Sequence, residues 1–282
     1  MSGARGGRSD PSDRRHRAGD ARRAARARAE RAGEQVEGRH AVRHLLAADR
    51  RPVRQVRLAE GLEPAAVLDE IVSLAASAAV PVRTVDRDRL RQLAATEAPQ
   101  GVIAIADPLP VSDLDDLASP GVDGTPPFLV VVDGVTDPHN LGALLRTAYC
   151  AGATGAVLPR HRATLVTAAV AKAAAGAIEY VPLSVVPGIP SALARLAAAG
   201  VWTVGLDAES QHPLWGLPLA TEPVALVVGA EGSGLSRLAR ARCQMVVAIP
   251  QVGQISSLNV AAAGAVACFE VSRLRHARVA LD

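Results

Sequence analysis

The chain has 282 residues, enough for one or two domains with buried cores, and 49% of them are hydrophobic, which is typical of a globular protein. Aromatic residues make up only 2%, so stacking platforms for single-stranded bases are scarce. The net charge of +3 depends on residues 1–35, where ten arginines face five acids, and the rest of the chain is slightly acidic. A protein that binds nucleic acid through an overall basic charge is therefore excluded, and any such binding must use local patches or the tail.

The cysteines and the hydropathy pattern indicate a compartment. The chain contains three well-separated cysteines, Cys150, Cys243 and Cys268. No CxxC pair accompanies them, so we expect reduced, structural cysteines and a cytoplasmic protein. No signal sequence opens the chain, and the uncharged stretch 243–269 is interrupted by Pro250 and Gly253, so no membrane partner is expected.

The first half of the chain predicts a tail, a small domain and a linker. Residues 1–35 are rich in arginine and alanine and are expected to form a disordered tail. Periodic patterns then predict helices at 38–48, 63–78 and 86–94 and strands at 53–59, 80–85 and 101–106. These elements make an α/β domain over 36–107. The proline- and aspartate-rich stretch 108–127 is expected to be a linker.

The second half, 128–282, predicts a larger α/β domain. Apolar patterns place strands at 128–132, 155–158, 178–181, 201–205, 224–228 and 245–249. Helical patterns fall at 140–151, 163–174, 190–199, 234–241 and 257–275. Short apolar strands alternating with helices indicate a parallel sheet covered on both faces, and ligands of such sheets bind where strands end and helices begin.

The first strand-to-helix turn of this domain is "VVDGVTDPHNLGALLRTA", residues 131–148. Asn140 can be read as the N-cap of the helix and Arg146 as a solvated side chain. Leucines at helical spacing form the buried face, and Arg146 projects from the opposite side, where it could meet a ligand. This stretch alone leaves both readings open.

The second turn is "PVALVVGAEGSGLSRLA", residues 223–239, a strand that ends in closely spaced glycines. Such glycines allow the backbone to approach a ligand. No GK[ST] follows, so it is not a P-loop, and the spacing does not match the G-x-G-x-x-G of a dinucleotide site. Glu231 within the turn would repel a phosphate, so a cationic or neutral ligand group fits better.

The third turn is "VVAIPQVGQISSLNVAAAGAVACFE", residues 246–270. It reads as a strand, an uncharged loop and a small-residue helix capped by Ser257, with Asn259 in the first turn. By itself this could be a closely packed capped helix. An uncharged, glycine-bearing loop also suits an adenine and a neutral ribose held by main-chain groups.

In order, spacing and spelling the three turns resemble the motifs of the SpoU (TrmH-like) branch of the SPOUT RNA 2'-O-ribose methyltransferases, over about residues 36–275. "EGRHAV", "AAAGAIEYVPL" and "TDPHN" look most like the members that methylate a guanosine of 23S ribosomal RNA. The resemblance implies a parallel-sheet domain with a C-terminal trefoil knot, a preceding L30e-like RNA-binding domain, and a homodimer with the active site near the subunit interface. Gln251 and Ala261 depart from the usual spelling, which affects only the expected details of cofactor packing.

The resemblance also implies a cofactor and a set of site residues. S-adenosylmethionine would be held, without a metal, by Val228, Gly229, Gly232, Ile249 and Leu258. The catalytic residues carried over by position are Asn140, Arg146, Glu231, Ser257 and Asn259.

The implied reaction transfers the sulfonium methyl group to a ribose 2'-oxygen. The family proposal makes Arg146 the base, but a guanidinium scarcely deprotonates, so clamping a phosphate and stabilising the developing alkoxide is equally compatible. Asn140 would orient the ribose or Arg146, and Glu231 would hold an arginine or the substrate. Ser257 and Asn259 would fix the loop around cofactor and acceptor.

Clustered arginines are the candidates for contact with RNA. They are Arg39, Arg43, Arg50, Arg51, Arg54 and Arg57 in the first domain and Arg160 and Arg162 after a strand of the second. Four alternatives remain open: a tRNA-directed enzyme of the same family, an antibiotic self-resistance enzyme acting on 23S ribosomal RNA, an inactive RNA-binding homologue, and a Rossmann-type oxidoreductase.

Overall fold

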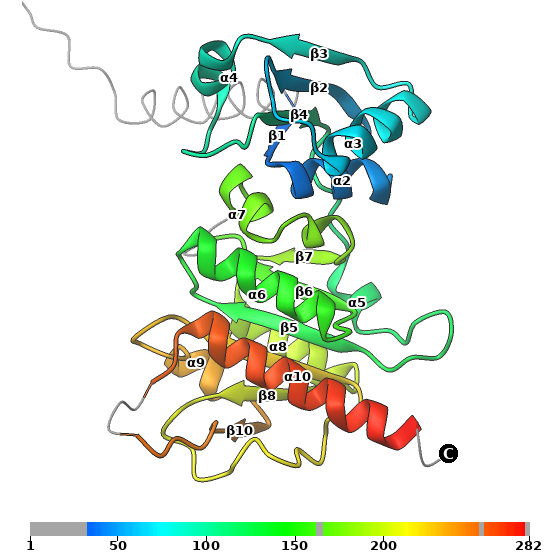
Figure 1. The fold of residues 1–282 in the computed structure, drawn as a ribbon. Coiled ribbons are helices and arrows are strands. Elements are labelled where there is room, and N and C mark those ends of the chain that lie inside the picture. The colour runs from blue at the N-terminus through cyan, green and yellow to red at the C-terminus, as the bar shows by residue number, and fades with distance from the viewer. Residues whose placement is uncertain (1–32, 162–165, 254–256, 280–282) are drawn as a thin grey trace, which may run out of the picture.

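The computed structural model describes residues 33–161, 166–253 and 257–279. They form two α/β units, each built around its own sheet (Figure 1). Nearly all of the predicted tail, together with Arg162, lies outside the described residues. No helix in the described part of the chain is long and apolar enough to cross a membrane.

The first unit is a four-stranded mixed sheet in the order β1-β4-β2-β3. Its strands are β1 (Glu34–Glu37), β2 (Val53–Ala59), β3 (Val82–Val85) and β4 (Val102–Ala106). Its helices are α2 (Arg39–Ala48), α3 (Ala66–Ser77) and α4 (Arg87–Leu93). The sequence did not predict β1, which starts inside the expected tail. Its polar sequence EQVE lacks the apolar pattern of a buried strand. Glu37 is nevertheless fully buried, and its carboxylate accepts hydrogen bonds from the backbone of Ala95 and Thr96.

Part of the expected linker 108–127 is folded. A short helix, α5 (Leu114–Leu117), buries Leu114 and Leu117 against the second unit, in the same apolar cluster as Leu193 of helix α8 (Ile189–Ala198). Val111 also forms a bridge to Leu183. The two leucines at i and i+3 are the minimal apolar stripe of a helix, and the surrounding acids and prolines masked it.

The second unit is a six-stranded sheet in the order β10-β8-β9-β5-β6-β7, and every pair in it is parallel, which confirms the predicted sheet. The strands are β5 (Phe128–Asp133), β6 (Gly155–Pro159), β7 (Leu183–Val186), β8 (Trp202–Leu206), β9 (Val224–Gly229) and β10 (Met245–Val247). The helices are α6 (Pro138–Cys150), α7 (Ala168–Ala173), α8 (Ile189–Ala198), α9 (Arg237–Arg240) and α10 (Val260–Val279).

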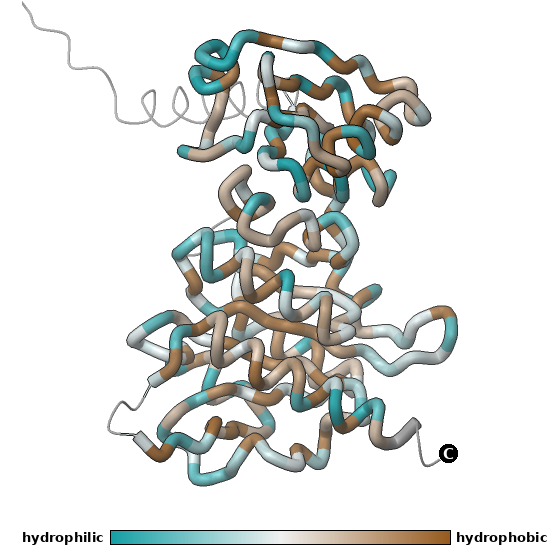
Figure 2. The backbone as a smooth tube through the Cα atoms, viewed as in Figure 1, coloured by the Kyte–Doolittle hydropathy of each residue, from teal (hydrophilic) through white to brown (hydrophobic). Residues whose placement is uncertain are grey.

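Helices cover both faces of this sheet, and strand β5 shows how. Val130 belongs to an apolar cluster with Leu144 of α6, whereas Val131 belongs to a second cluster with Leu196 of α8. Alternate residues of one strand therefore serve two cores, which is why these strands read as continuous apolar runs. Figure 2 shows the same hydrophobic concentration along β5, and Figure 1 shows α6 and α10 side by side on one face.

The predicted strand at 178–181 is wrong. A short 3-10 helix, η1 (Ala177–Glu179), occupies this segment, and the strand begins only at Leu183. The sequence IEYV has strand-like residues, but its acid serves the contact between the two units: Glu179 is 1% exposed and pairs with Arg51. A tertiary ion pair thus overrides local propensity.

The contact between the two units, here called the seam, is centred on Arg51 of the first unit. Its guanidinium donates to both carboxylate oxygens of Glu179, at 3.0 and 2.6 Å, and to Glu34 and the carbonyl of Asp107. Beside it, His44 lies within 3.1 Å of the Tyr180 hydroxyl. The seam joins α2 of the first unit to η1 of the second and sets the orientation of the two.

Candidate active site

The topology brings the first two motifs together. Strands β5 and β9 are paired along their length, and their last residues, Asp133 and Gly229, are partners. The chain leaves β5 toward β6 on one side, whereas it leaves β9 toward β10 on the other. The loops after β5 and β9 therefore diverge from adjacent strand ends, which is where open parallel sheets bind ligands.

Three polar side chains, one from each motif, meet at this edge. Asn140 Nδ2 donates to Glu231 Oε2 at 3.1 Å, and Asn259 Nδ2 donates to Asn140 Oδ1 at 3.0 Å. Asn259 Nδ2 also lies 3.3 Å from Glu231 Oε1. We call Asn140, Glu231 and Asn259 the triad. Each side chain bonds to both others, so the triad fixes the relative positions of segments 91 and 28 residues apart in sequence.

The start of α6 differs from the reading of Asn140 as its N-cap. Asp137 is the cap, and its carboxylate accepts from the His139 amide at 2.9 Å, with Pro138 in the first helical turn. Asn140 lies inside the helix, and its side chain is available to the triad. The sequence contains both signals, and an aspartate directly before a proline is the stronger start signal.

The start of α10 also differs from the prediction. Helix α10 begins at Val260, and Asn259 caps it by accepting from the amides of Ala261 and Ala262 at 2.9 and 3.3 Å. Ser257, predicted as the cap, lies two residues earlier on exposed chain. Asn259 therefore acts twice, because its Oδ1 caps the helix while its Nδ2 joins the triad.

The glycine-rich loop after β9 places Glu231 at its tip. Ala230 and Gly234 exchange two backbone hydrogen bonds of 2.9 Å, which closes the loop. A Cβ added at Gly229 would lie 2.2 Å from the carbonyl carbon of Gly234, so only glycine permits this approach. Gly232 and Gly234 have φ values of +79° and +63°, in the left-handed region. The loop is therefore specified by its glycines.

Arg146 lies apart from the triad. It is exposed on the outer face of α6, and six residues of helix place it about 9 Å along the axis from Asn140. It forms no hydrogen bond or ion pair with any residue that the structure describes. The structure therefore does not join Arg146 to Asn140 or to Glu231, and Glu231 holds two asparagines where an arginine was one expectation.

Arg146 faces the seam. The pKa of His44 is lowered, first by burial and then by the positive charges of Arg43, His40 and Arg146. Tyr180 stacks on Tyr149 of α6, with ring centroids 5.3 Å apart. Sequence patterns gave no sign of His44 or Tyr180, because their proximity exists only once the two units are docked.

The residues expected to hold a cofactor lie on the same edge of the sheet. Val228 is buried and Gly229 ends β9, while Gly232 has nothing within 4 Å of the place where a Cβ would be. Ile249 is half-buried just after β10, and Leu258 is 42% exposed beside Asn259.

This donor set fits S-adenosylmethionine. The described segment 249–253 carries no charge, and the glycines leave main-chain groups accessible, which suits a neutral adenosine group. Glu231 supplies negative charge at the rim, which suits a sulfonium and not a phosphate. Residues 254–256, in the third motif, lie outside the described residues.

The arginines that were expected to bind RNA differ in their burial and in their hydrogen-bond partners. Arg51 is 5% exposed and fully engaged in the seam, so its assignment to RNA contact is wrong. Arg43 pairs with Glu70 and Arg54 with Asp107 at the surface, while Arg39 donates to the Gln100 carbonyl. Arg160 is exposed and lines a cavity with Arg195.

The three cysteines are free, but Cys150 is exposed, so the expectation of a structural role does not hold for it. Burial raises the pKa of Cys243 to about 11 and that of Cys268 to about 12, so both are inert thiols. Within the described ranges no group of His, Cys, Asp and Glu side chains is arranged to hold a metal ion.

Two protein families match different parts of the chain. Residues 127–269 match the SpoU rRNA Methylase family, and residues 35–112 match the family described as RNA 2'-O ribose methyltransferase substrate binding.

Full-length relatives agree with these matches. The chain is 40% identical to the 23S rRNA (guanosine-2'-O-)-methyltransferase RlmB of Ralstonia nicotianae, over 84% of this chain and 94% of that one. It is 39% identical to RlmB of Pseudomonas putida, over 87% and 98%. The crystal structure of the SpoU methyltransferase AviRb from Streptomyces viridochromogenes in complex with AdoMet superposes with a TM-score of 0.73, at 25% identity, over 88% of this chain and 92% of that one.

Proposed function

Because the chain belongs to the SpoU rRNA methylase family, we propose that it transfers a methyl group from S-adenosylmethionine to a ribose 2'-oxygen of a guanosine in 23S ribosomal RNA. The observation that carries the proposal is the triad, in which one residue from each of three motifs meets at the carboxyl ends of β5 and β9. The substrate assignment is supported by relatives that carry this name and align over nearly their whole length.

The bound cofactor supplies an electrophilic methyl group on sulfur. Main-chain groups at Gly229, Ile249 and Leu258 would hold it, beside the side chains of Val228 and Ile249. The closed loop 230–234 keeps Gly232 clear of neighbouring atoms and leaves room for the ligand. The glycines thus serve the site because they have no side chain that would occupy this space.

The triad has a positioning role. Glu231 accepts from two amides and thereby holds the first turn of α6, the glycine loop and the start of α10 in one arrangement. Asn140 keeps one amide hydrogen and one oxygen lone pair for the ribose, whereas Asn259 uses its donors and acceptors within the protein. Rigid placement of reacting groups of this kind is a main source of rate acceleration in group transfer.

Arg146 acts on the RNA and not as the base. A guanidinium keeps its proton at neutral pH, and this one has no ion-pair partner among the described residues. Its donors match a phosphate, so it would clamp the phosphate next to the target ribose and stabilise negative charge on the 2'-oxygen while solvent water accepts the 2'-hydroxyl proton.

Several expectations stay part of the proposal. We propose a homodimer, a trefoil knot in the second domain and a cytoplasmic location. The domain boundaries 36–107 and 128–282, the role of Ser257, and RNA contacts by Arg39, Arg43, Arg54, Arg160 and Arg162 are likewise proposed.

The test supplies labelled S-adenosylmethionine with unmodified 23S ribosomal RNA and tRNA in parallel, followed by nuclease digestion and mass spectrometry of the nucleosides. Label in 2'-O-methylguanosine from 23S ribosomal RNA is expected. Label in tRNA alone would overturn the substrate, and label on a base would overturn the reaction.

A further inference from the structure

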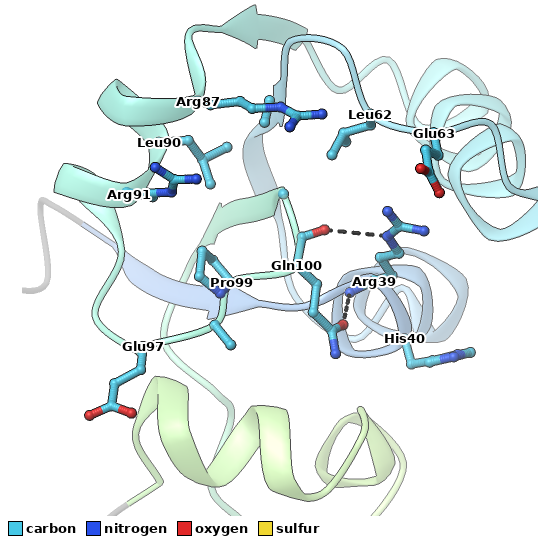
Figure 3. A pocket seen from close by; sticks show the side chains of 13 residues that line it. Arg39, His40, Leu62, Glu63, Arg87, Leu90, Arg91, Glu97, Pro99 and Gln100 are labelled. Atoms are coloured by element: carbon cyan, nitrogen blue, oxygen red, sulfur yellow. Dashed lines mark hydrogen bonds between the residues drawn. The ribbon is translucent and has the colours of Figure 1, made fainter.

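The first domain contains a cavity that the methyl-transfer site does not use. It is open to solvent, has a volume of about 760 Å³ and is lined by the start of α2, by α4, by the turn after β2 and by the turn that leads into β4. This volume is within the range of small-ligand sites. Figure 3 shows Leu62, Leu90 and Pro99 directed into it from three separate segments.

The walls combine apolar surface with charges of both signs. Leu90 is 1% exposed and forms part of the floor. Arg39 and Arg91 lie on opposite sides, and Glu63 stands beside Arg39 (Figure 3). A site for an anion alone would not include the two carboxylates of Glu63 and Glu97, and a site for an apolar group alone would not include three guanidinium groups.

The rim of the cavity is held in a fixed shape. Gln100 and Gly101 have φ values of +56° and +76°, and the Val102 amide donates to the Pro99 carbonyl at 3.1 Å, which closes a tight turn. Gln100 Oε1 accepts from the Arg39 amide at 3.1 Å, and Arg39 Nε lies 3.3 Å from the Gln100 carbonyl. A left-handed glutamine is an uncommon conformation that these bonds maintain at the cavity edge.

We propose that this cavity binds one unpaired nucleotide of the RNA substrate, at a position other than the methylated ribose. Guanidinium groups match its phosphate, the apolar floor matches a base face, and Glu63 can accept from N–H groups on the base edge. With aromatic residues at 2% of the chain, base stacking here must use aliphatic and guanidinium surfaces. The inference rests on the proposed function, because RNA must be the substrate.

Helix α2 connects the cavity to the surroundings of Arg146 on α6. Arg39 lies at the first turn of α2, and His44 is about 7.5 Å further along that helix. His44 contacts Tyr180, which stacks on Tyr149, three residues beyond Arg146 on α6. One helix therefore spans from the cavity to the surroundings of Arg146. The bound nucleotide belongs to the same RNA segment as the target ribose.

The test measures binding without cofactor, by fluorescence anisotropy, of an oligoribonucleotide that contains the target and has single abasic replacements at flanking positions. Three variants are compared with the native protein. Ala98→Tyr fills the cavity from an exposed position, and Arg91→Glu reverses a charge in its wall. Arg89→Glu is the matched control, since it changes an exposed arginine on the same helix that does not line the cavity.

For the native protein, one flanking abasic site is expected to weaken binding about tenfold. The penalty should shrink to within about twofold in Ala98→Tyr and Arg91→Glu and persist in Arg89→Glu, with melting temperatures near native for all three, since the Arg91–Asp88 pair is solvent-exposed. A penalty equal in all proteins, or no sensitive flanking position, would overturn the cavity site. Because binding is read without methyl transfer, a protein that binds in this way but never methylates RNA would overturn only the proposed function.

Discussion

Arg51 in the seam and Arg146 on α6 are the same residue type near the same contact between domains, yet their surroundings are opposite. Arg51 is 5% exposed and its donors are matched by two carboxylates and a carbonyl. Arg146 is exposed and has no hydrogen bond or ion pair within the described part of the chain. An arginine whose donors are satisfied within the protein is structural, whereas an exposed arginine without a partner in the described part of the chain is available to a substrate.

The largest effect is expected from breaking the seam. Arg51→Ala leaves Glu179 buried without its partner, so the free energy of unfolding should fall by about 3–5 kcal/mol, measured by urea denaturation. Arg195→Ala is the control, because its ion pair with Asp115 is exposed and should contribute at most about 1 kcal/mol. Equal losses for the two variants would contradict a structural role specific to Arg51.

The two roles of Asn259 can be separated by choice of substitution. Asn259→Ala removes the helix cap and the triad bonds, so stability should fall by about 1 kcal/mol and methyl transfer should fall as well. Asn259→Asp keeps a capping oxygen but loses the Nδ2 donor beside Glu231. The rate of methyl transfer should therefore fall by a larger factor than the equilibrium constant for folding. Ser257→Ala should leave thermal stability unchanged. An active Asn259→Asp enzyme would argue against the triad.

The smallest effect concerns pH. The pKa of His44 is lowered below its usual 6.5 by burial and neighbouring positive charge, so the unfolded chain binds this proton more readily than the folded one. The stability that neutral His44 provides is present above pH 6.5 and is lost as pH falls through the lower folded pKa. The melting temperature should therefore drop less between pH 7.5 and 5.5 in His44→Gln than in the native protein. Identical pH profiles would exclude this contribution.

The sequence predicted the parallel sheet and the three site-bearing turns because these depend on local patterns: apolar runs, glycines and polar residues at strand ends. It did not predict β1, η1 or the seam. Glu37 and Glu179 are buried only because distant groups satisfy them, and no local pattern encodes those partners. The caps at Asp137 and Asn259 were missed by two or three residues, since several polar residues near each helix start could serve.

The most direct test of the account is the single-turnover rate of methyl transfer to ribosomal RNA by Arg146→Ala, with its melting temperature measured on the same preparation. Because Arg146 is exposed and unpaired within the described structure, the rate should fall by about 10²–10³-fold while the melting temperature stays within about 2 °C of native. A near-native rate, or a rate and melting temperature that fall together, would contradict the assignment of Arg146 to the substrate.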